Sequence, residues 1–187
     1  DKAHFKELDP EIGMFNDGIR DAVKGSVFEK EESGFADGGG DAAELKKGIL
    51  SCLGGGDFPV ENPGQSITYL SCHDNLTLWD KLSAVNWLKP VGDPEEKRLA
   101  QNRLCAAIYL CCPGRVFFLS GEEGARTKNG DENSYNAPIE ENAVHWDQLY
   151  AHKDLIGYYK GLISLRKSLP ILCRKDDHLA DDYMITG

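Results

Sequence analysis

The sequence lacks the long apolar segments that span a membrane or direct a chain into secretion. No apolar stretch approaches the roughly 18 residues that a spanning helix needs, and the first residues, DKAHFKELD, contain no apolar signal-peptide core. A basic excess is missing too, because 21 Lys and Arg face 31 Asp and Glu, a formal net charge of −10. Such a surface repels phosphates and anionic lipids. We therefore expect no nucleic-acid or membrane partner, and a neutral or cationic ligand.

Patterns typical of metal centres are also missing. The sequence has six cysteines but no C-x-x-C pair, and it has no His-x-His or H-E-x-x-H spacing. Most of the cysteines lie in apolar segments, which favours buried, reduced thiols and a cytoplasmic protein. We predict no cofactor and no metal ligands. Acidic loops such as residues 131–133 would accommodate a structural calcium ion without requiring one.

What the sequence does contain is an alternation of short apolar runs and amphipathic segments. With 187 residues and 41% hydrophobic content, the chain can bury one core. Strands are predicted at Ile12–Asn16, Ser66–Cys72 and Arg115–Ser120, and helices at residues 19–23, 42–53, 76–87, 93–110 and 153–169. The order strand, helix, strand, helix, strand, helix is typical of a parallel α/β sheet.

Two details refine this prediction. The run RVFFLS is continuously apolar, which indicates a strand that is covered on both faces. The Gly-rich segment Ser26–Asp41 and the polar segment Gly121–Trp146 are predicted to be loops without packed elements. Three strands cannot close a barrel, which usually needs about 250 residues. We therefore expect either a small open sheet or one end of a larger domain.

The most informative polar residues follow the second predicted strand. His73, Asp74 and Asn75 come directly after the apolar run SITYLSC. Side chains at the carboxyl ends of parallel strands are where chemistry is usually placed. This pair could orient a hydroxyl, stabilise a cation or bind a metal. Alternatively, Asp74 or Asn75 could simply cap the next helix.

Three stretches in this order resemble one enzyme family. YLSCHDNLTLWDKL, IGMFNDGIRDAVKGSVF and RVFFLSGEEGARTKNGDENSYNAP are similar to segments of the α-amylase-type glycoside hydrolases of family 13, in their debranching, type I pullulanase branch. The resemblance implies strands six, seven and eight of a (β/α)8 barrel. Residues 1–172 would form the C-terminal part of that barrel, and residues 173–187 would begin a β-sandwich domain.

The resemblance also implies roles for single residues. Asp74 would stabilise the transition state, and His73 would bind a hydroxyl of the same sugar. Asn75, Tyr135 and Asn136 would contact substrate, and Glu123 would match a supporting glutamate at the end of strand eight. In the family, the nucleophile and the general acid lie on strands four and five, before the segment that begins at Asp1. We therefore expect this chain to supply neither.

The resemblance implies hydrolysis of α-1,6 branch linkages in pullulan, glycogen or limit dextrins by a retaining mechanism. The partner would be an α-glucan, and the isolated segment would be inactive and would self-associate through exposed barrel edges. Three alternatives stay open. They are an enzyme acting on α-1,4 linkages, a non-catalytic α-glucan-binding module, and a small hydrolase in which His73 and Asp74 hold a metal with Asp131 or Glu132.

Overall fold

The computed structural model describes residues 2–7, 9, 11–54, 58, 60–89 and 94–173. Residues 174–187, which make up nearly all of the predicted second domain, therefore lie outside the described residues. The strands are β1 Met14–Phe15, β2 Ser66–Thr68 and β3 Arg115–Val116. The α-helices are α1 Asp17–Lys24, α2 Ala42–Ser51, α3 Leu78–Trp87, α4 Glu95–Leu110, α5 Ile139–Asn142, α6 Trp146–Ala151, α7 Lys153–Ser168 and α8 Pro170–Cys173. Short 3-10 helices are η1 Lys2–Glu7, η2 Phe35–Asp37, η3 Pro63–Gln65, η4 Glu122–Gly124 and η5 Ser134–Asn136.

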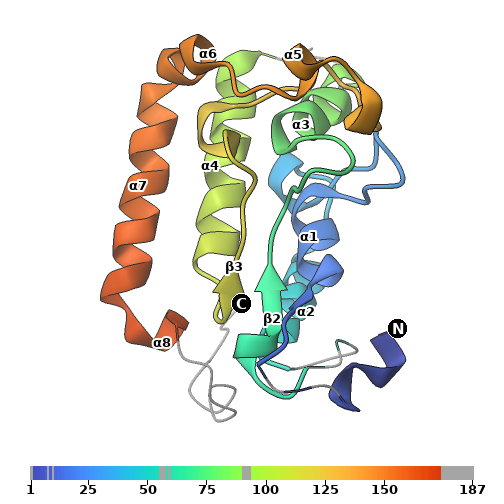
Figure 1. The fold of residues 1–187 in the computed structure, drawn as a ribbon, viewed down its shortest axis with the longest axis vertical. Coiled ribbons are helices and arrows are strands. Elements are labelled where there is room, and N and C mark those ends of the chain that lie inside the picture. The colour runs from blue at the N-terminus through green and yellow to red at the C-terminus, as the bar shows by residue number, and fades with distance from the viewer. Residues whose placement is uncertain are drawn as a thin grey trace.

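The three strands form a parallel sheet in the order β1-β2-β3. Met14 pairs with Ser66 and Ile67 pairs with Arg115, so the strands lie in chain order. Helices connect consecutive strands, as a parallel sheet requires. In Figure 1 β2 and β3 point toward the end of the molecule where α3, α5 and α6 lie, so the loops after the strands gather there. The predicted α/β architecture is confirmed.

The hydrophobic core lies between the sheet and the long helices. Its buried members include Ile19, Leu70, Leu82, Tyr109 and Leu155, which come from α1, the end of β2, α3, α4 and α7. In Figure 1, α4 lies beside α7 toward the left of the view and α1 lies beside α2 toward the right. Each helix therefore buries one stripe against a shared core.

The other face of the sheet carries a row of aromatic side chains. The ring centroid of Phe15 lies 4.5 Å from that of Tyr69 and 5.5 Å from that of Phe117. Phe15 and Phe117 are 40% and 38% exposed, whereas Val116 and Phe118 pack on the core. The prediction that β3 is covered on both faces is therefore wrong for the described residues. A continuous apolar run cannot distinguish a second covering layer from an aromatic face that is left open.

The start of α1 explains why β1 ends so abruptly. The side chain of Asn16 accepts hydrogen bonds from the amides of Gly18 and Ile19 and so caps the helix. Its Nδ2 donates to Ser51 Oγ at 2.9 Å and to Ser66 Oγ at 3.1 Å. Asn16 is fully buried. One amide therefore ties the ends of β1 and α2 to the start of β2.

The strands are shorter than predicted. Among the described residues, the last backbone bond from the β3 segment to β2 runs from Phe117 N to Thr68 O at 2.9 Å. Beyond that point, the chain after β1 has already entered α1. Tyr69 and the residues after it therefore have a strand-like sequence but no neighbouring strand with which to pair. Hydrophobic periodicity reports burial and cannot report whether a neighbouring strand is still present.

Both predicted loops contain packed elements, which corrects the prediction. In the Gly-rich segment, Asp37 of η2 is buried and its Oδ2 accepts from Gly34 N at 3.1 Å. A Cβ on Gly34 would lie 2.3 Å from Gly25 N, so the glycine permits a close backbone approach. In the polar segment, η4, η5, α5 and the first residue of α6 occur. Short elements that are held by polar contacts produce no periodic pattern of apolar residues in the sequence.

The cysteines and the membrane prediction can be compared with the structure directly. Cys52, Cys105 and Cys112 are buried, Cys72 is half-buried, and Cys111 and Cys173 are exposed. All six thiols are free of disulfide bonds. The prediction of burial holds for half of them. Within the described ranges, no helix has the length and apolar character needed to cross a bilayer.

Gly114 should tolerate no side chain. It has φ +88°, and a Cβ there would lie 2.1 Å from Pro63 O. We expect Gly114→Ala to lower the free energy of unfolding by at least about 2 kcal/mol, because left-handed strain and a backbone clash add. The measurement is urea unfolding, and the control is Gly157→Ala on α7, where a Cβ would meet nothing within 4 Å. Equal stability of the two variants would contradict this prediction.

Candidate functional site

A cavity of about 540 Å³ lies at the carboxyl ends of the strands. Its walls are aromatic residues of the open sheet face, polar residues of α1, and the turn after β2. The lining residues are Phe15, Asp17, Arg20, Lys24, Val27, Tyr69, Leu70, Ser71, Cys72, His73, Asp74, Asn75 and Phe117. The structure therefore brings His73, Asp74 and Asn75 together on a concave surface at the predicted end of the sheet.

His73 and Asp74 form the exposed rim of this cavity. His73 Nε2 lies 3.5 Å from Asp74 Oδ2, and the side chains are 86% and 70% exposed. A carboxylate in this place can accept hydrogen bonds from hydroxyl groups and favour nearby positive charge. The pair is therefore available to a ligand that enters the cavity.

The turn does not cap the following helix, which excludes the alternative that Asp74 or Asn75 is an N-cap. The N-cap of α3 is Thr77, whose hydroxyl accepts from Asp80 N at 3.1 Å. Asn75 instead has φ 61°, in the left-handed region where Asn is among the few non-glycine residues found regularly. It allows the chain to reverse between Asp74 and α3. Two residues lie between Asn75 and the first residue of α3, so neither His73 nor Asp74 caps this helix.

Two other predicted contact residues lie outside the cavity wall. Tyr135 is 83% exposed, and Tyr135 and Asn136 are part of η5. Ser134 is buried and exchanges hydrogen bonds with Asn142 at 2.6 and 2.8 Å, which fixes η5 against the end of α5. The role of Tyr135 and Asn136 toward a substrate stays a prediction.

The metal alternative gains no support from the geometry. Over the described ranges, no group of three or more His, Cys, Asp or Glu side chains converges as metal ligands do. Asp131 Oδ1 accepts from Asn133 N at 2.8 Å, and Glu132 forms a 3.1 Å ion pair with Lys30. These acidic side chains are thus used in local contacts.

A polar cluster forms the floor of the cavity. Arg20 and Asp21 form an ion pair, with Arg20 Nε 2.6 Å from Asp21 Oδ1. Arg20 Nη1 also donates to Tyr69 OH at 2.5 Å, and Tyr69 OH donates to Asp17 Oδ1 at 2.8 Å. Burial and the hydrogen bond to Asp17 raise the pKa of Tyr69, which keeps the hydroxyl protonated. The Asp17 carboxylate at the start of α1 is therefore connected by hydrogen bonds to Tyr69 and Arg20 at the floor of the cavity.

Glu122 is the residue that the sequence analysis missed. Its neighbour Glu123 was matched to the supporting glutamate, but Glu123 Oε2 only accepts from Gly121 N at 2.9 Å. Glu122 is 4% exposed and accepts from Ser71 Oγ at 2.5 Å, Tyr109 OH at 2.7 Å and Tyr159 OH at 3.2 Å. Burial raises the pKa of Glu122, and these hydrogen bonds oppose that rise. The one available signal was its position two residues after the predicted strand Arg115–Ser120.

Lys24 is a buried cation on the wall of the same cavity. It is 1% exposed, and burial together with the charge of Arg20 lowers the pKa of Lys24 to about 8, while Glu122 acts in the opposite direction. Lys81, which is also buried, repels it. The buried Lys24 ammonium therefore lowers the stability of the fold by an amount that depends on pH.

We expect the stability difference between Lys24→Met and the wild type to depend on pH. The folded pKa of about 8 lies below the ordinary 10.5, so between these values the unfolded chain binds more protons and stability from this group rises with pH. Below pH 8 the full cost, on the order of 3 kcal/mol, applies. The advantage of Lys24→Met in urea unfolding should therefore shrink from pH 7 to pH 10. Lys160→Met, on the exposed side of α7, is the control. A pH-independent difference would contradict the prediction.

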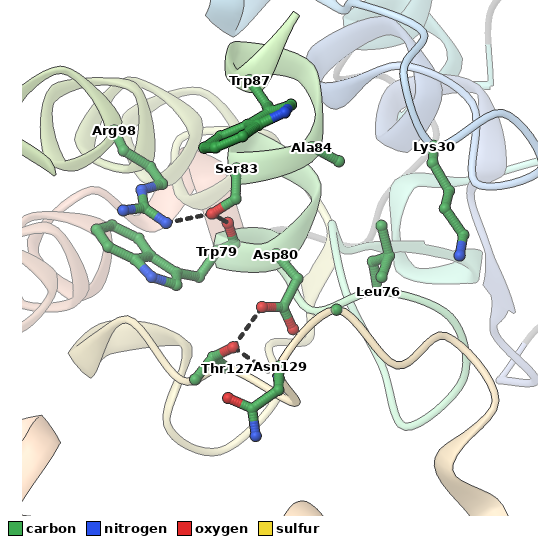
Figure 2. A pocket seen from close by; sticks show the side chains of 11 residues that line it. Lys30, Leu76, Trp79, Asp80, Ser83, Ala84, Trp87, Arg98, Thr127 and Asn129 are labelled. Carbon is green, nitrogen blue, oxygen red and sulfur yellow. Dashed lines mark hydrogen bonds between the residues drawn. The ribbon is translucent and has the colours of Figure 1, made fainter. Parts of the chain in front are cut away.

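A second cavity of about 390 Å³ lies behind the turn, between α3 and the loop after β3. Figure 2 shows Asp80 pointing toward Thr127, whose hydroxyl donates to it, and Arg98 beside Trp79. The Arg98 guanidinium lies 4.0 Å from the Trp79 ring centroid. Trp79 is 7% exposed and belongs to the core, whereas Trp87 at the rim is 79% exposed. This cavity shows how Asp80 attaches the Thr127 loop to α3.

The comparisons with known proteins agree on one group of enzymes. No protein-family model matches the chain. Pullulanase of Bacillus subtilis strain 168 is 43% identical over 164 residues, which cover 86% of this chain and 22% of that protein. An isoamylase of a Flavobacterium species is 29% identical over 140 residues, or 64% of this chain and 18% of that protein. The chain thus spans about a fifth of these relatives.

Solved structures give the same result. The crystal structure of pullulanase from Paenibacillus barengoltzii in complex with maltohexaose and α-cyclodextrin aligns with a TM-score of 0.85 at 40% identity. The alignment covers 97% of this chain and 28% of that chain. Pullulanase from Bacillus acidopullulyticus aligns with a TM-score of 0.81 at 35% identity over 91% of this chain and 20% of that chain. Nearly the whole described fold is therefore matched by one segment of these enzymes.

Proposed function

We propose that this chain, which belongs with the pullulanases and related debranching enzymes, forms part of an enzyme that hydrolyses α-1,6-glucosidic branch linkages in α-glucans. One observation carries the proposal. The segment that is similar to pullulanases carries, in the turn that follows its second strand, an accessible His-Asp pair on a cavity. Pullulan, glycogen and limit dextrins are the substrates that we propose.

The fold supports a position within a larger barrel. We propose that β1, β2 and β3 correspond to strands six, seven and eight of a (β/α)8 barrel, with residues 1–172 in the barrel and residues 173–187 at the start of a following β domain. Helices cover one face of the sheet, and the aromatic row of Phe15, Tyr69 and Phe117 lies on the other. In a barrel this second face would point inward. In the isolated chain, the same face would drive self-association.

The proposed mechanism is a retaining double displacement. A covalent glycosyl-enzyme intermediate requires a nucleophile and a general acid about 5 Å apart, which we expect outside this chain. Asp74 supplies a third carboxylate that stabilises the oxocarbenium-like charge on the sugar ring. His73 orients a hydroxyl of the same sugar, and Asn75, Tyr135 and Asn136 contribute further substrate contacts. The chain alone is therefore proposed to be inactive.

Hydrolysis of pullulan tests the function. The enzyme that contains this chain should release maltotriose from pullulan and should leave linear α-1,4-linked amylose intact. Release from amylose but not from pullulan would replace the proposal with an α-1,4-acting enzyme. Maltotriose binding by the enzyme without any hydrolysis would favour the glucan-binding module instead.

A further inference from the structure

The Asp74 side chain has little to hold it in place. It is 70% exposed and its described ion-pair contact is with His73, itself 86% exposed, at 3.5 Å. The position of this carboxylate therefore depends on the backbone of the turn at residues 71–75. An error of about 1 Å in a group that acts on a transition state can cost on the order of 100-fold in rate. What fixes the turn is therefore a functional question.

The segment that follows β3 holds the turn at its first residue and at its middle. Before Asp74, Ser71 Oγ donates to Glu122 Oε2 at 2.5 Å. At the pair itself, Lys128 Nζ donates to the carbonyl oxygen of His73 at 3.1 Å. Glu122 and Lys128 are 4% and 2% exposed, so the charged partner of each bond is buried; the Ser71–Glu122 bond is fully buried and the Lys128–His73 bond is part-buried. A charged partner in each bond makes it stronger than a neutral one.

The two holding residues are themselves attached to helices. Glu122 Oε1 accepts from Tyr109 of α4 and Tyr159 of α7, at 2.7 and 3.2 Å. The backbone of Lys128 donates to Asp80 Oδ2 of α3 at 2.8 Å. The turn is thus connected through two buried charges to three helices.

We propose that Glu122 and Lys128 are positioning residues, which fix the Ser71–Asn75 turn at Ser71 and at His73 and so place the Asp74 carboxylate against the substrate. This inference rests on the proposed function. The residues touch no reacting atom; they act through the backbone that carries Asp74. A merely structural role would stabilise the fold without a separate effect on turnover.

Two hydroxyl deletions separate these roles in the enzyme that contains this chain. Ser71→Ala and Tyr159→Phe each remove one hydrogen bond to the same carboxylate, but only Ser71 lies on the turn. Tyr159→Phe also removes the 2.9 Å bond from Tyr159 OH to Asn102 Oδ1, so we expect its urea midpoint to fall at least as far as that of Ser71→Ala. On pullulan, Ser71→Ala should lower kcat about 10-fold with KM within about twofold, whereas Tyr159→Phe should keep kcat within about twofold. Equal kcat values for the two variants would overturn the inference.

Lys128 provides a second, independent test of the inference. Lys128→Met should lower kcat like Ser71→Ala, and Lys160→Met on the exposed side of α7 is its matched control. If the wild-type enzyme does not hydrolyse pullulan, the proposed function fails, and NMR of the 187-residue chain still decides on the positioning role. The amide signals of His73 and Asp74 should shift in Ser71→Ala and Lys128→Met and stay in Tyr159→Phe. Unshifted signals would contradict the inference.

Discussion

Asp74→Asn is expected to lower kcat on pullulan by about 10³-fold, or about 4 kcal/mol of transition-state stabilisation. The substitution keeps the shape of the side chain and removes its charge. A carboxylate that faces developing positive charge loses most of its effect when it becomes an amide, because the amide offers only a dipole. Since the interaction is made in the transition state, kcat and kcat/KM should fall together.

The structure makes this variant a clean test. The Asp74 side chain is 70% exposed, so the free energy of unfolding should change by less than about 0.5 kcal/mol. Asp147→Asn provides the matched control, because Asp147 is an exposed carboxylate on α6 and does not line the cavity. Initial rates of maltotriose release give the result. A kcat within about twofold of the wild type would mean that Asp74 is not the transition-state stabiliser.

The elements of the fold with a clear period were predictable from the sequence. The predicted helices at 42–53 and 153–169 correspond to α2 and α7, and the order of strands and helices is confirmed. Amphipathic spacing and Gly or Pro stops act within one segment, so a single sequence contains them. The ends of the strands were not predictable, because a ladder requires a neighbour that lies some 50 residues away in the chain.

The candidate site divides in the same way. His73 and Asp74 were predictable because they follow an apolar run directly. The roles of Glu122 and Lys128 were not predictable, since they arise from contacts with Ser71 and His73, which lie 51 and 55 residues away in sequence. A buried charge leaves no composition signal, because Lys and Glu are ordinarily solvent-exposed residues.

Glu122→Leu is expected to lower the free energy of unfolding by about 3–5 kcal/mol. The hydroxyls of Ser71 and Tyr109 would lose their acceptor in a buried region, whereas Tyr159 OH would keep Asn102 Oδ1. Lys24 would also lose the opposite charge that favours its protonated form. Glu122→Gln, which keeps an acceptor oxygen, should cost clearly less than the leucine variant.

A double-mutant cycle isolates the contribution of the charges. In Glu122→Leu the buried ammonium of Lys24 is left without its compensating carboxylate, so adding Lys24→Met should restore part of the lost stability. Urea unfolding of the two single variants and the double variant at pH 7 gives the coupling energy. Strictly additive free energies would show that the two buried charges do not stabilise each other, and the cost of Glu122→Leu would then come from the lost hydroxyl hydrogen bonds alone.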